Sequence, residues 1–209
     1  MICAWEDDPH TFLELAREGD RLGYATIGVS DSIFRDTYVS LALLAGETRR
    51  ARIGPMVTNP VTRHPSVTAN AISAVHDLSG GRAILGIGTG DSAVRSLQVK
   101  PATVDRLEQS VTAIRALTRG REAPFDGAVL QHRWATGGVP VHVTAEGPRT
   151  LRMAGRVADG STDAGELVAI AYLFTLLALP IRAIGWVLAD LPRALAGMDR
   201  VTPVLDATG

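Results

Sequence analysis

Two similar segments in the middle of the chain place the strongest constraint on its fold. Each reads as an apolar strand that ends in polar or glycine residues: residues 53–65 run Ile-Gly-Pro-Met-Val-Thr-Asn-Pro-Val-Thr-Arg-His-Pro, and residues 83–91 run Ala-Ile-Leu-Gly-Ile-Gly-Thr-Gly-Asp. A helix is predicted between them. Strands separated by helices are typical of parallel sheets, in which the segments after the strands meet at one edge. The sequence therefore predicts a site at the carboxyl ends of parallel strands.

The same alternation extends over residues 1–160, about five times. Strands are predicted at 2–5, 25–30, 53–57, 83–88 and 139–144, and helices at 9–22, 38–48, 67–78, 104–117 and 148–158. Residues 119–138 are predicted to form a loop or hairpin, because prolines and glycines interrupt them. Asp8 and Thr103 are expected to cap helices. In the first helix, one apolar face is predicted from Phe12, Leu15, Ala16, Gly19 and Leu22.

This pattern predicts an α/β fold, and alternation alone allows either a doubly wound sheet or a barrel. The character of the sequence changes after Gly160. Residues 167–181 form a run of fifteen uncharged residues, and no further strand–helix alternation follows. We therefore predict two parts, an α/β domain over residues 1–160 and an apolar helical tail over residues 161–209.

Composition excludes several classes of function. A formal net charge of −1 gives no basic footprint for nucleic acid. Cys3 is the only cysteine, so no intrachain disulfide can form. No signal peptide is recognised, which predicts a cytoplasmic protein. The five histidines show no metal-ligand spacing, so no metal site is expected.

Three motifs allow both a functional and a structural interpretation. The glycine-rich segment 86–91 can cradle an anion on backbone N–H groups, although a tight turn is the favoured alternative. Residues 145–148 precede a predicted helix, whose first N–H groups can hold a phosphate, and again an ordinary turn is favoured. Asp31 and Asp91 each follow a strand and can act as acid, base or cofactor ligand, or only as turn residues. Neither a Walker loop nor a hydrolase elbow is present.

Taken together and in order, several of these segments resemble the luciferase-like monooxygenase family. The resemblance covers residues 11–160 and is strongest to its branch of methylenetetrahydromethanopterin-reductase-like proteins, which use the deazaflavin coenzyme F420. It is carried by residues 22–24 with 29–31, 57–65, 78–82 with 86–91, and 139–148 with 154–155 and 158–160.

The resemblance implies a (β/α)8 barrel with the cofactor at the carboxyl ends of its strands. It implies a non-prolyl cis peptide at Met56–Val57, behind the deazaflavin ring. Asp31 and Asp91 become the acid/base candidates, because Ser32 replaces a histidine that some relatives use in proton transfer. The implied cofactor contacts are Asp31, Ser32, Met56, Val57, Thr58, Asn59, Gly88, Thr89, Gly90, Asp91, Ala145, Glu146, Gly147 and Pro148.

The implied reaction is hydride transfer between reduced F420 and an organic small molecule, with FMN as the alternative cofactor. A typical barrel needs about 250 residues, so the barrel is expected to be incomplete, its activity impaired and its binding of F420 weak or absent. Residues 165–209 instead resemble the last membrane helix and linker of an ABC exporter. The alternative function is therefore a non-catalytic truncated or fused fragment, associated with a membrane through residues 167–189. Homo-oligomerisation is left open.

Overall fold

The computed structural model describes residues 2–4, 8–32, 35–145 and 147–157. The chain divides into two units, Met1–Asp159 and Gly160–Gly209. Everything described below belongs to the first unit. The predicted tail, its exporter likeness and its membrane contact lie outside the described residues. Within the described part, no helix is long and apolar enough to cross a bilayer.

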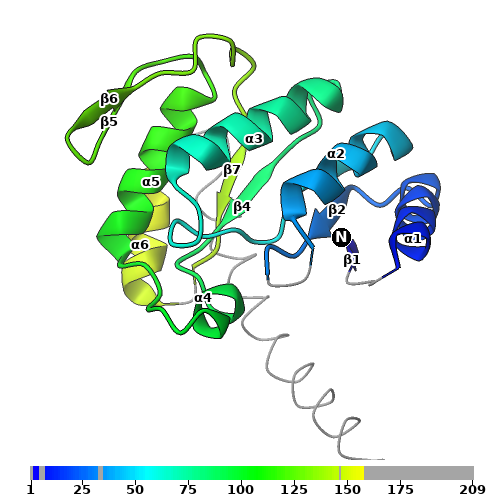
Figure 1. Cartoon of the computed structure of the whole chain (residues 1–209), viewed down its shortest axis with the longest axis horizontal. Helices are drawn as coiled ribbons and strands as arrows, with labels where there is room; N and C mark the ends of the chain where they lie inside the picture. The colour runs from blue at the N-terminus through cyan, green and yellow to red at the C-terminus, as the bar shows by residue number, and fades with distance from the viewer. Residues whose placement is uncertain (1, 5–7, 33–34, 146, 158–209) are drawn as a thin grey trace, which may run out of the picture. The chain divides into compact units, whose positions relative to one another are not determined.

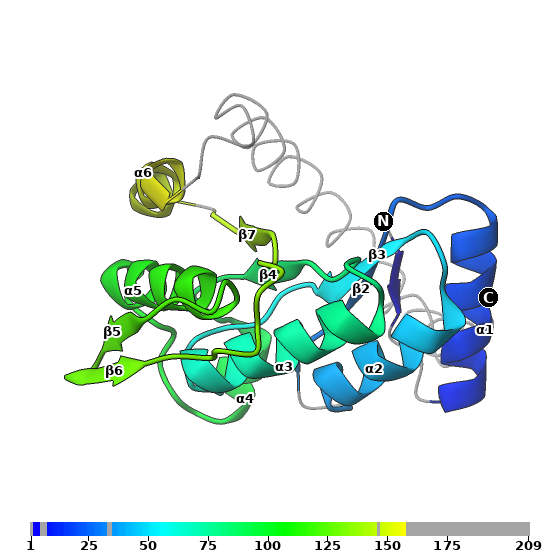
Figure 2. The ribbon, with the colours of Figure 1, turned by 90° about the horizontal axis from the view of Figure 1, so that it is seen from above.

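Five parallel strands form the centre of the first unit (Figures 1 and 2). They are β1 (Ile2–Ala4), β2 (Thr26–Val29), β3 (Arg52–Pro55), β4 (Leu85–Ile87) and β7 (Val141–Val143). β1 pairs with β2, β2 with β3, and β4 with β7. Two isolated parallel bridges, Ile53 to Ala83 and Thr58 to Ile87, join the β3 and β4 segments. The strands thus follow one another in chain order.

This sequential order decides between the two architectures that the alternation allows. A doubly wound sheet starts near its middle and reverses direction at a switch point. Here each new strand is added on the same side of the previous one, as in the wall of a (β/α)8 barrel. The predicted α/β class is therefore confirmed, with five of the strands that such a barrel contains.

The helices follow the strands and pack as neighbours in chain order. They are α1 (Pro9–Arg21), α2 (Thr37–Glu47), α3 (Pro65–Leu78), α5 (Val104–Leu117) and α6 (Pro148–Val157), with a short α4 (Ser92–Ser96) before α5. Contacts join α1 to α2, α2 to α3, α3 to α5, and α5 to α6. Their inner faces and the strands bury one continuous apolar core, which includes Leu41, Ile53, Ile72, Leu85, Leu107 and Ile114.

Helix starts follow the local chemistry of the sequence. The Asp8 side chain accepts a hydrogen bond from the N–H of Thr11, and Thr103 accepts one from Arg106, so both predicted caps are confirmed. The sequence did not predict His64 as a cap. Its Nδ1 accepts a hydrogen bond from the Ser66 N–H at 3.2 Å, and α3 consequently begins at Pro65.

The predicted apolar face of α1 is partly wrong. Phe12, Ala16 and Gly19 are buried, but Leu15 is 45% exposed and Leu22, which lies just beyond the helix, is 60% exposed. The carboxylate of Asp20 takes the inward position instead, because its hydrogen bonds to the backbone of residues 49–51 pull it against the sheet. The hairpin alternative for residues 119–138 is confirmed by the antiparallel pair β5 (Ala123–Phe125) and β6 (Ala128–Leu130).

Candidate functional site

Parallel pairing brings the predicted site segments to one edge of the sheet. Residues 31–32 follow β2, residues 56–59 follow β3, residues 88–91 follow β4, and residues 145–148 follow β7. All four segments extend from the carboxyl ends of neighbouring parallel strands. This is the edge at which α/β proteins place their ligands.

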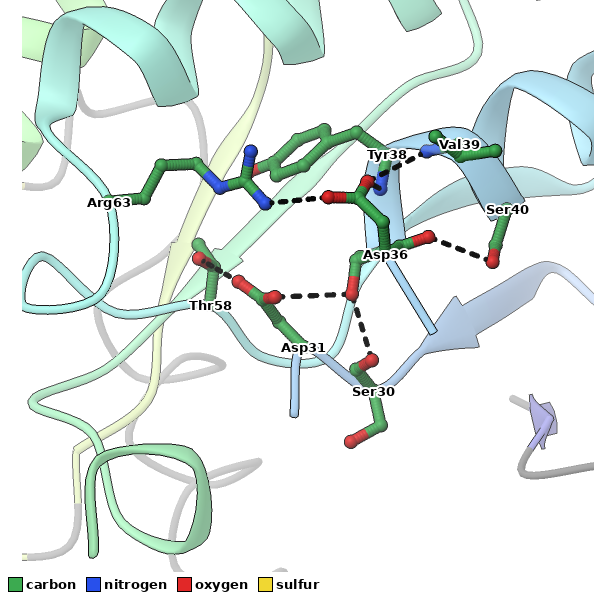
Figure 3. A network of polar contacts seen from close by, with 9 residues as sticks. Ser30, Asp31, Asp36, Tyr38, Val39, Ser40, Thr58 and Arg63 are labelled. Carbon is green, nitrogen blue, oxygen red and sulfur yellow. Dashed lines mark hydrogen bonds and ion pairs between the residues drawn. The ribbon is translucent and has the colours of Figure 1, made fainter. Parts of the chain in front are cut away.

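Asp31 is the centre of a hydrogen-bond network at this edge (Figure 3). The hydroxyl of Thr58 donates to its Oδ2 at 2.5 Å. The hydroxyl of Thr37 lies 3.2 Å from its Oδ1 and also donates to the backbone oxygen of Ser30 at 2.8 Å. Thr58 therefore holds one carboxylate oxygen with a short hydrogen bond, while the single proton of Thr37 is shared between Ser30 and the other carboxylate oxygen.

Tyr38 and Arg63 lie beside this network. The phenol ring is 7% exposed, and its hydroxyl makes no hydrogen bond of good geometry with the described residues. Burial raises the pKa of Tyr38, and the negative charge of Asp31 raises it further. The guanidinium of Arg63 lies 4.7 Å from the centre of the ring, and it pairs with Asp36 at 3.1 Å (Figure 3). Tyr38 is therefore a neighbour of both the half-buried Asp31 carboxylate and a partly exposed ion pair.

The peptide bond between Met56 and Val57 is cis, as the family resemblance implies. It lies in a bulge. Five residue steps separate Ile53 from Thr58, while only four separate their partners Ala83 and Ile87 on the neighbouring strand. One extra residue is thus inserted between β3 and the point where pairing resumes, a common way of re-aiming a side chain near a site.

Asn59 is 2% exposed, and its side chain organises the loop after the bulge. Its Oδ1 accepts hydrogen bonds from the N–H groups of Val61 and Thr62 at 3.0 and 2.9 Å, and from the Thr62 hydroxyl at 3.2 Å. This geometry is an Asx turn. The oxygen of Asn59 is consequently occupied by the protein's own backbone.

The glycines of segment 86–91 are required by packing within the protein. A Cβ on Gly86 would lie 2.5 Å from the backbone oxygen of Pro55, in the bulge. A Cβ on Gly88 would collide with the hydroxyl of Thr144, and one on Gly90 with Val94. Gly90 also has a φ of +96°, which favours glycine. Close packing therefore accounts for Gly86 and Gly88, and a turn conformation for Gly90. The intervening Thr89 is half-buried, and its backbone oxygen accepts a hydrogen bond from the N–H of Ala102.

Asp91 does not join the network around Asp31. Its side chain is 62% exposed and pairs with the guanidinium of Arg95 one helical turn later, at 2.5 Å. It forms no side-chain cap on α4. The structure thus separates the two predicted acid/base candidates, with Asp31 held among other side chains and Asp91 directed to the surface.

The predicted phosphate-binding segment precedes α6. Ala145 is buried, Gly147 lies at the start of the helix, and its backbone oxygen accepts the N–H of Leu151. Pro148 is the first residue of α6. Glu146 lies outside the described residues. The N–H groups of the first turn of α6 therefore face the carboxyl edge of the sheet beside β7.

Two other features of the described part bear on the site. No group of three His, Cys, Asp or Glu side chains lies close enough there to hold a metal ion. An open hollow of about 660 Å³ is found by the hairpin, lined by Asn70, Val129, Gln131, His132, Arg133 and Trp134. None of these six residues belongs to the predicted site.

Comparison with known proteins identifies the family to which this chain belongs. The model of the luciferase-like monooxygenase family matches residues 4–168, which is most of the chain. The chain belongs to the luciferase-like monooxygenase family. The predicted family is therefore confirmed, and the match runs past the predicted boundary at residue 160.

Several curated enzymes are similar in sequence to this chain. The 5,10-methylenetetrahydromethanopterin reductase of Archaeoglobus fulgidus is 37% identical over 60% of this chain and 40% of that protein. The reductase of Methanolobus tindarius is 34% identical over 69% of this chain and 47% of that protein. The F420-dependent glucose-6-phosphate dehydrogenase of Beutenbergia cavernae is 31% identical over 91% and 62%, an alignment that includes part of residues 161–209. The chain thus spans about half the length of the curated relatives it matches.

Several solved structures share the fold. The F420-dependent tetrahydromethanopterin reductase of Methanopyrus kandleri superposes with a TM-score of 0.62 at 23% identity, over 76% of this chain and 52% of that one. An F420-dependent secondary alcohol dehydrogenase superposes with a TM-score of 0.64 at 19% identity, over 76% of this chain and 55% of that one. The FMN-bound diketocamphane monooxygenase of Pseudomonas putida superposes with a TM-score of 0.57 at 17% identity, over 71% of this chain and 50% of that one.

Sequence reasoning missed four residues around Asp31, namely Asp36, Thr37, Tyr38 and Arg63. Asp36 carried a usable signal, because an aspartate before a helix is a typical cap, and its Oδ1 accepts hydrogen bonds from the N–H groups of Tyr38 and Val39. The contacts of Thr37 depend on how the start of α2 packs beside the loop after β2, and those of Arg63 on how α2 packs beside the loop after β3. No spacing rule in the sequence encodes that packing.

Proposed function

We propose that this chain forms the deazaflavin-binding part of an F420-dependent oxidoreductase, in which a hydride passes between reduced F420 and an organic small molecule. The observation that carries the proposal is the convergence of the four predicted cofactor segments at one sheet edge, where Thr58 holds the carboxylate of Asp31. The relatives named for F420, at 31–32% identity, support the choice of cofactor. FMN remains the alternative cofactor, as in one structural neighbour.

The residues at this edge fit a ring with polar groups and a phosphate. The Ser32 hydroxyl is buried and makes no hydrogen bond with the described residues, so it is available to a ligand that reaches it. The first N–H groups of α6, beginning near Gly147, favour an anion through the helix dipole. The segment from Met56 to Asn59 would support the ring from behind, as the family resemblance implies.

When bound, reduced F420 would supply the hydride, and the chain's own residues would orient it. Asp31 is the acid/base candidate that we retain, because its carboxylate is fixed by Thr58 and Thr37. We assign Asp91 to the turn after β4, since its exposed carboxylate is paired with Arg95. Burial of the residues that follow β3 would help to keep water from the reacting face.

Titration of the purified chain with F420, followed by the fluorescence of the deazaflavin, tests this proposal. We expect saturable one-to-one binding with a Kd on the order of 10 μM to 1 mM, which corresponds to roughly 4–7 kcal/mol. FMN should compete poorly. A fluorescence that changes only linearly with added F420, or an FMN affinity equal to that of F420, would refute the proposal.

The exporter likeness of residues 165–209, the membrane contact of residues 167–189 and the alternative of a non-catalytic fragment remain predictions, as does homo-oligomerisation. No described residue bears on the first three. Co-sedimentation of the full chain with phospholipid vesicles tests the membrane contact, and light scattering tests the oligomer.

A further inference from the structure

Thr58 connects three neighbouring strand ends. Its backbone N–H donates to Gly86 at 2.9 Å, and its backbone oxygen accepts the N–H of Gly88 at 2.9 Å, so both main-chain groups are used in pairing with the β4 segment. Its hydroxyl donates to Asp31, just beyond β2. The segments that follow β2 and β3 and the β4 strand end are therefore held together by one residue.

The bulge determines where the Thr58 side chain points. Paired residues in a parallel sheet place their side chains on the same face, and side chains alternate along a regular strand. Ala83 and Ile87, four residues apart, share a face, and so do their partners Ile53 and Thr58. In a regular strand, residues five apart would lie on opposite faces. The extra residue in the bulge thus turns Thr58 to the face of Ile53.

Burial keeps Thr58 from direct contact with a ligand. The residue is 0% exposed, both of its main-chain groups are paired with β4, and its hydroxyl is used by Asp31. A cofactor contact of the Thr58 side chain, as the family resemblance implies, would require the residues packed over it to move. Asp31 is only half-buried, so its carboxylate can still be approached from outside.

We propose that Thr58 is a positioning residue, which the bulge aims at Asp31 and which fixes the Asp31 carboxylate for binding of the deazaflavin. This inference rests on the proposed function. In this role, the bulge directs the Thr58 hydroxyl toward Asp31, which follows the neighbouring strand β2. The effect of Thr58 on the cofactor is then transmitted through Asp31.

Two substitutions separate the hydroxyl from the shape of the side chain. Thr58→Val keeps the volume and removes the hydroxyl, while Thr58→Ser keeps the hydroxyl. Thr118→Val is the matched control, because Thr118 is also buried, at 1% exposed, and its hydroxyl makes only a 3.3 Å hydrogen bond at the end of α5. We expect Thr58→Val to weaken F420 binding about tenfold, and Thr58→Ser and Thr118→Val to change it less than about threefold.

A second measurement does not need the cofactor. In protein labelled with ¹³C at aspartate, the carboxyl resonance of Asp31 should shift in Thr58→Val and stay near its wild-type position in Thr58→Ser and Thr118→Val. In the wild-type protein, the Thr58 hydroxyl proton should exchange slowly with water, because it is buried and hydrogen-bonded. This last observation remains informative if the valine variant does not fold.

The outcomes distinguish this inference from the proposed function. Failure of the wild-type chain to bind F420 would refute the proposed function. The carboxyl resonance of Asp31 would then still test whether Thr58 positions Asp31. An unshifted Asp31 resonance in folded Thr58→Val, a rapidly exchanging Thr58 hydroxyl, or unchanged F420 affinity in that variant would overturn the inference. A serine variant as impaired as the valine variant would overturn it as well.

Discussion

The carboxylate of Asp20 accepts a hydrogen bond from the backbone N–H of Ala51 at 2.6 Å, across 31 positions of sequence. The N–H groups of Arg49 and Arg50 donate to the same carboxylate at 2.9 Å. Asp20, near the end of α1, thereby holds the turn that leads into β3. The described part of the chain thus uses a buried charge to connect its first helix to its third strand.

Replacement of Asp20 by asparagine should destabilise the fold by about 2–4 kcal/mol, because the amide provides one acceptor and no charge for three backbone donors. Urea unfolding followed by circular dichroism measures the loss. The control is Asp77→Asn on the exposed side of α3, which should change stability by less than about 0.5 kcal/mol. Equal effects of the two substitutions would contradict the role assigned to Asp20.

The stability that Asp20 provides should depend on pH. Burial alone would raise the pKa of Asp20, but the three backbone N–H groups outweigh it, so the pKa is lowered. A group with a lowered folded-state pKa contributes fully above its unfolded pKa of about 3.9 and loses the contribution as pH falls through the folded value. The difference in unfolding free energy between wild type and Asp20→Asn should therefore be constant from neutral pH to about pH 5 and shrink below about pH 4. A difference that grows on acidification would disprove this.

Substitution of Arg82 by lysine should cost about 2–4 kcal/mol. The guanidinium donates to the backbone oxygens of Ala45, Thr48, Ala51 and Ser79 and to the Thr48 hydroxyl, at 2.8–3.1 Å. A single ammonium cannot reach all of these acceptors, so several would be left unsatisfied at the end of α2. Thermal melting of Arg82→Lys beside Arg121→Lys, an exposed control, measures the effect.

Two glycine-to-alanine substitutions should have opposite effects. Gly86→Ala should destabilise by roughly 1–3 kcal/mol, because its Cβ would lie 2.5 Å from the Pro55 oxygen and 2.9 Å from a methyl of Val57. Gly46→Ala should stabilise by about 0.5–1 kcal/mol, because Gly46 lies within α2 with nothing near its Cβ position. Chemical denaturation of both variants tests the pair, and a stabilising Gly86→Ala would show that the bulge has room to relax.

Substitution of the two acid/base candidates should change the F420 affinity of the protein to different extents. Asp31→Asn removes a charge and an acceptor from the network with Thr37 and Thr58, and we expect about tenfold weaker binding. Asp91→Asn alters an exposed pair with Arg95 and should change binding by less than about twofold. Fluorescence titration of both variants provides the comparison. A larger loss for Asp91→Asn would restore Asp91 as the acid/base candidate.

Much of the fold could be predicted from the sequence because its determinants are local. Apolar runs followed by glycine or polar residues marked the strands, and Asp8 and Thr103 marked helix starts through caps that act within three residues. The cis peptide at Met56–Val57 was predicted only through the family resemblance, since Gly54-Pro55-Met56 alone indicates a strand end. α4 was missed because five residues carry little periodicity.

The geometry of the site could be predicted only in part. Strand ends placed Asp31, Asn59 and Gly88 at the correct edge, since parallel pairing decides the edge. The sequence could not indicate that Asp31 would be fixed by Thr58 or that Asp91 would turn outward to Arg95, because both outcomes depend on distances between segments. The roles of the predicted cofactor contacts stay predictions, and Glu146 lies outside the described residues.

The order of the first four strands along the sheet also bears on how the protein is made. β2 to β4 each pair with the strand that precedes them in the chain, and contacts join α1 to α2, α2 to α3, α3 to α5 and α5 to α6. Neighbouring strand–helix units of this region therefore leave the ribosome one after another, which favours their assembly during synthesis. Each strand–helix unit can dock on an edge that already exists, so growth of the sheet can keep pace with elongation of the chain.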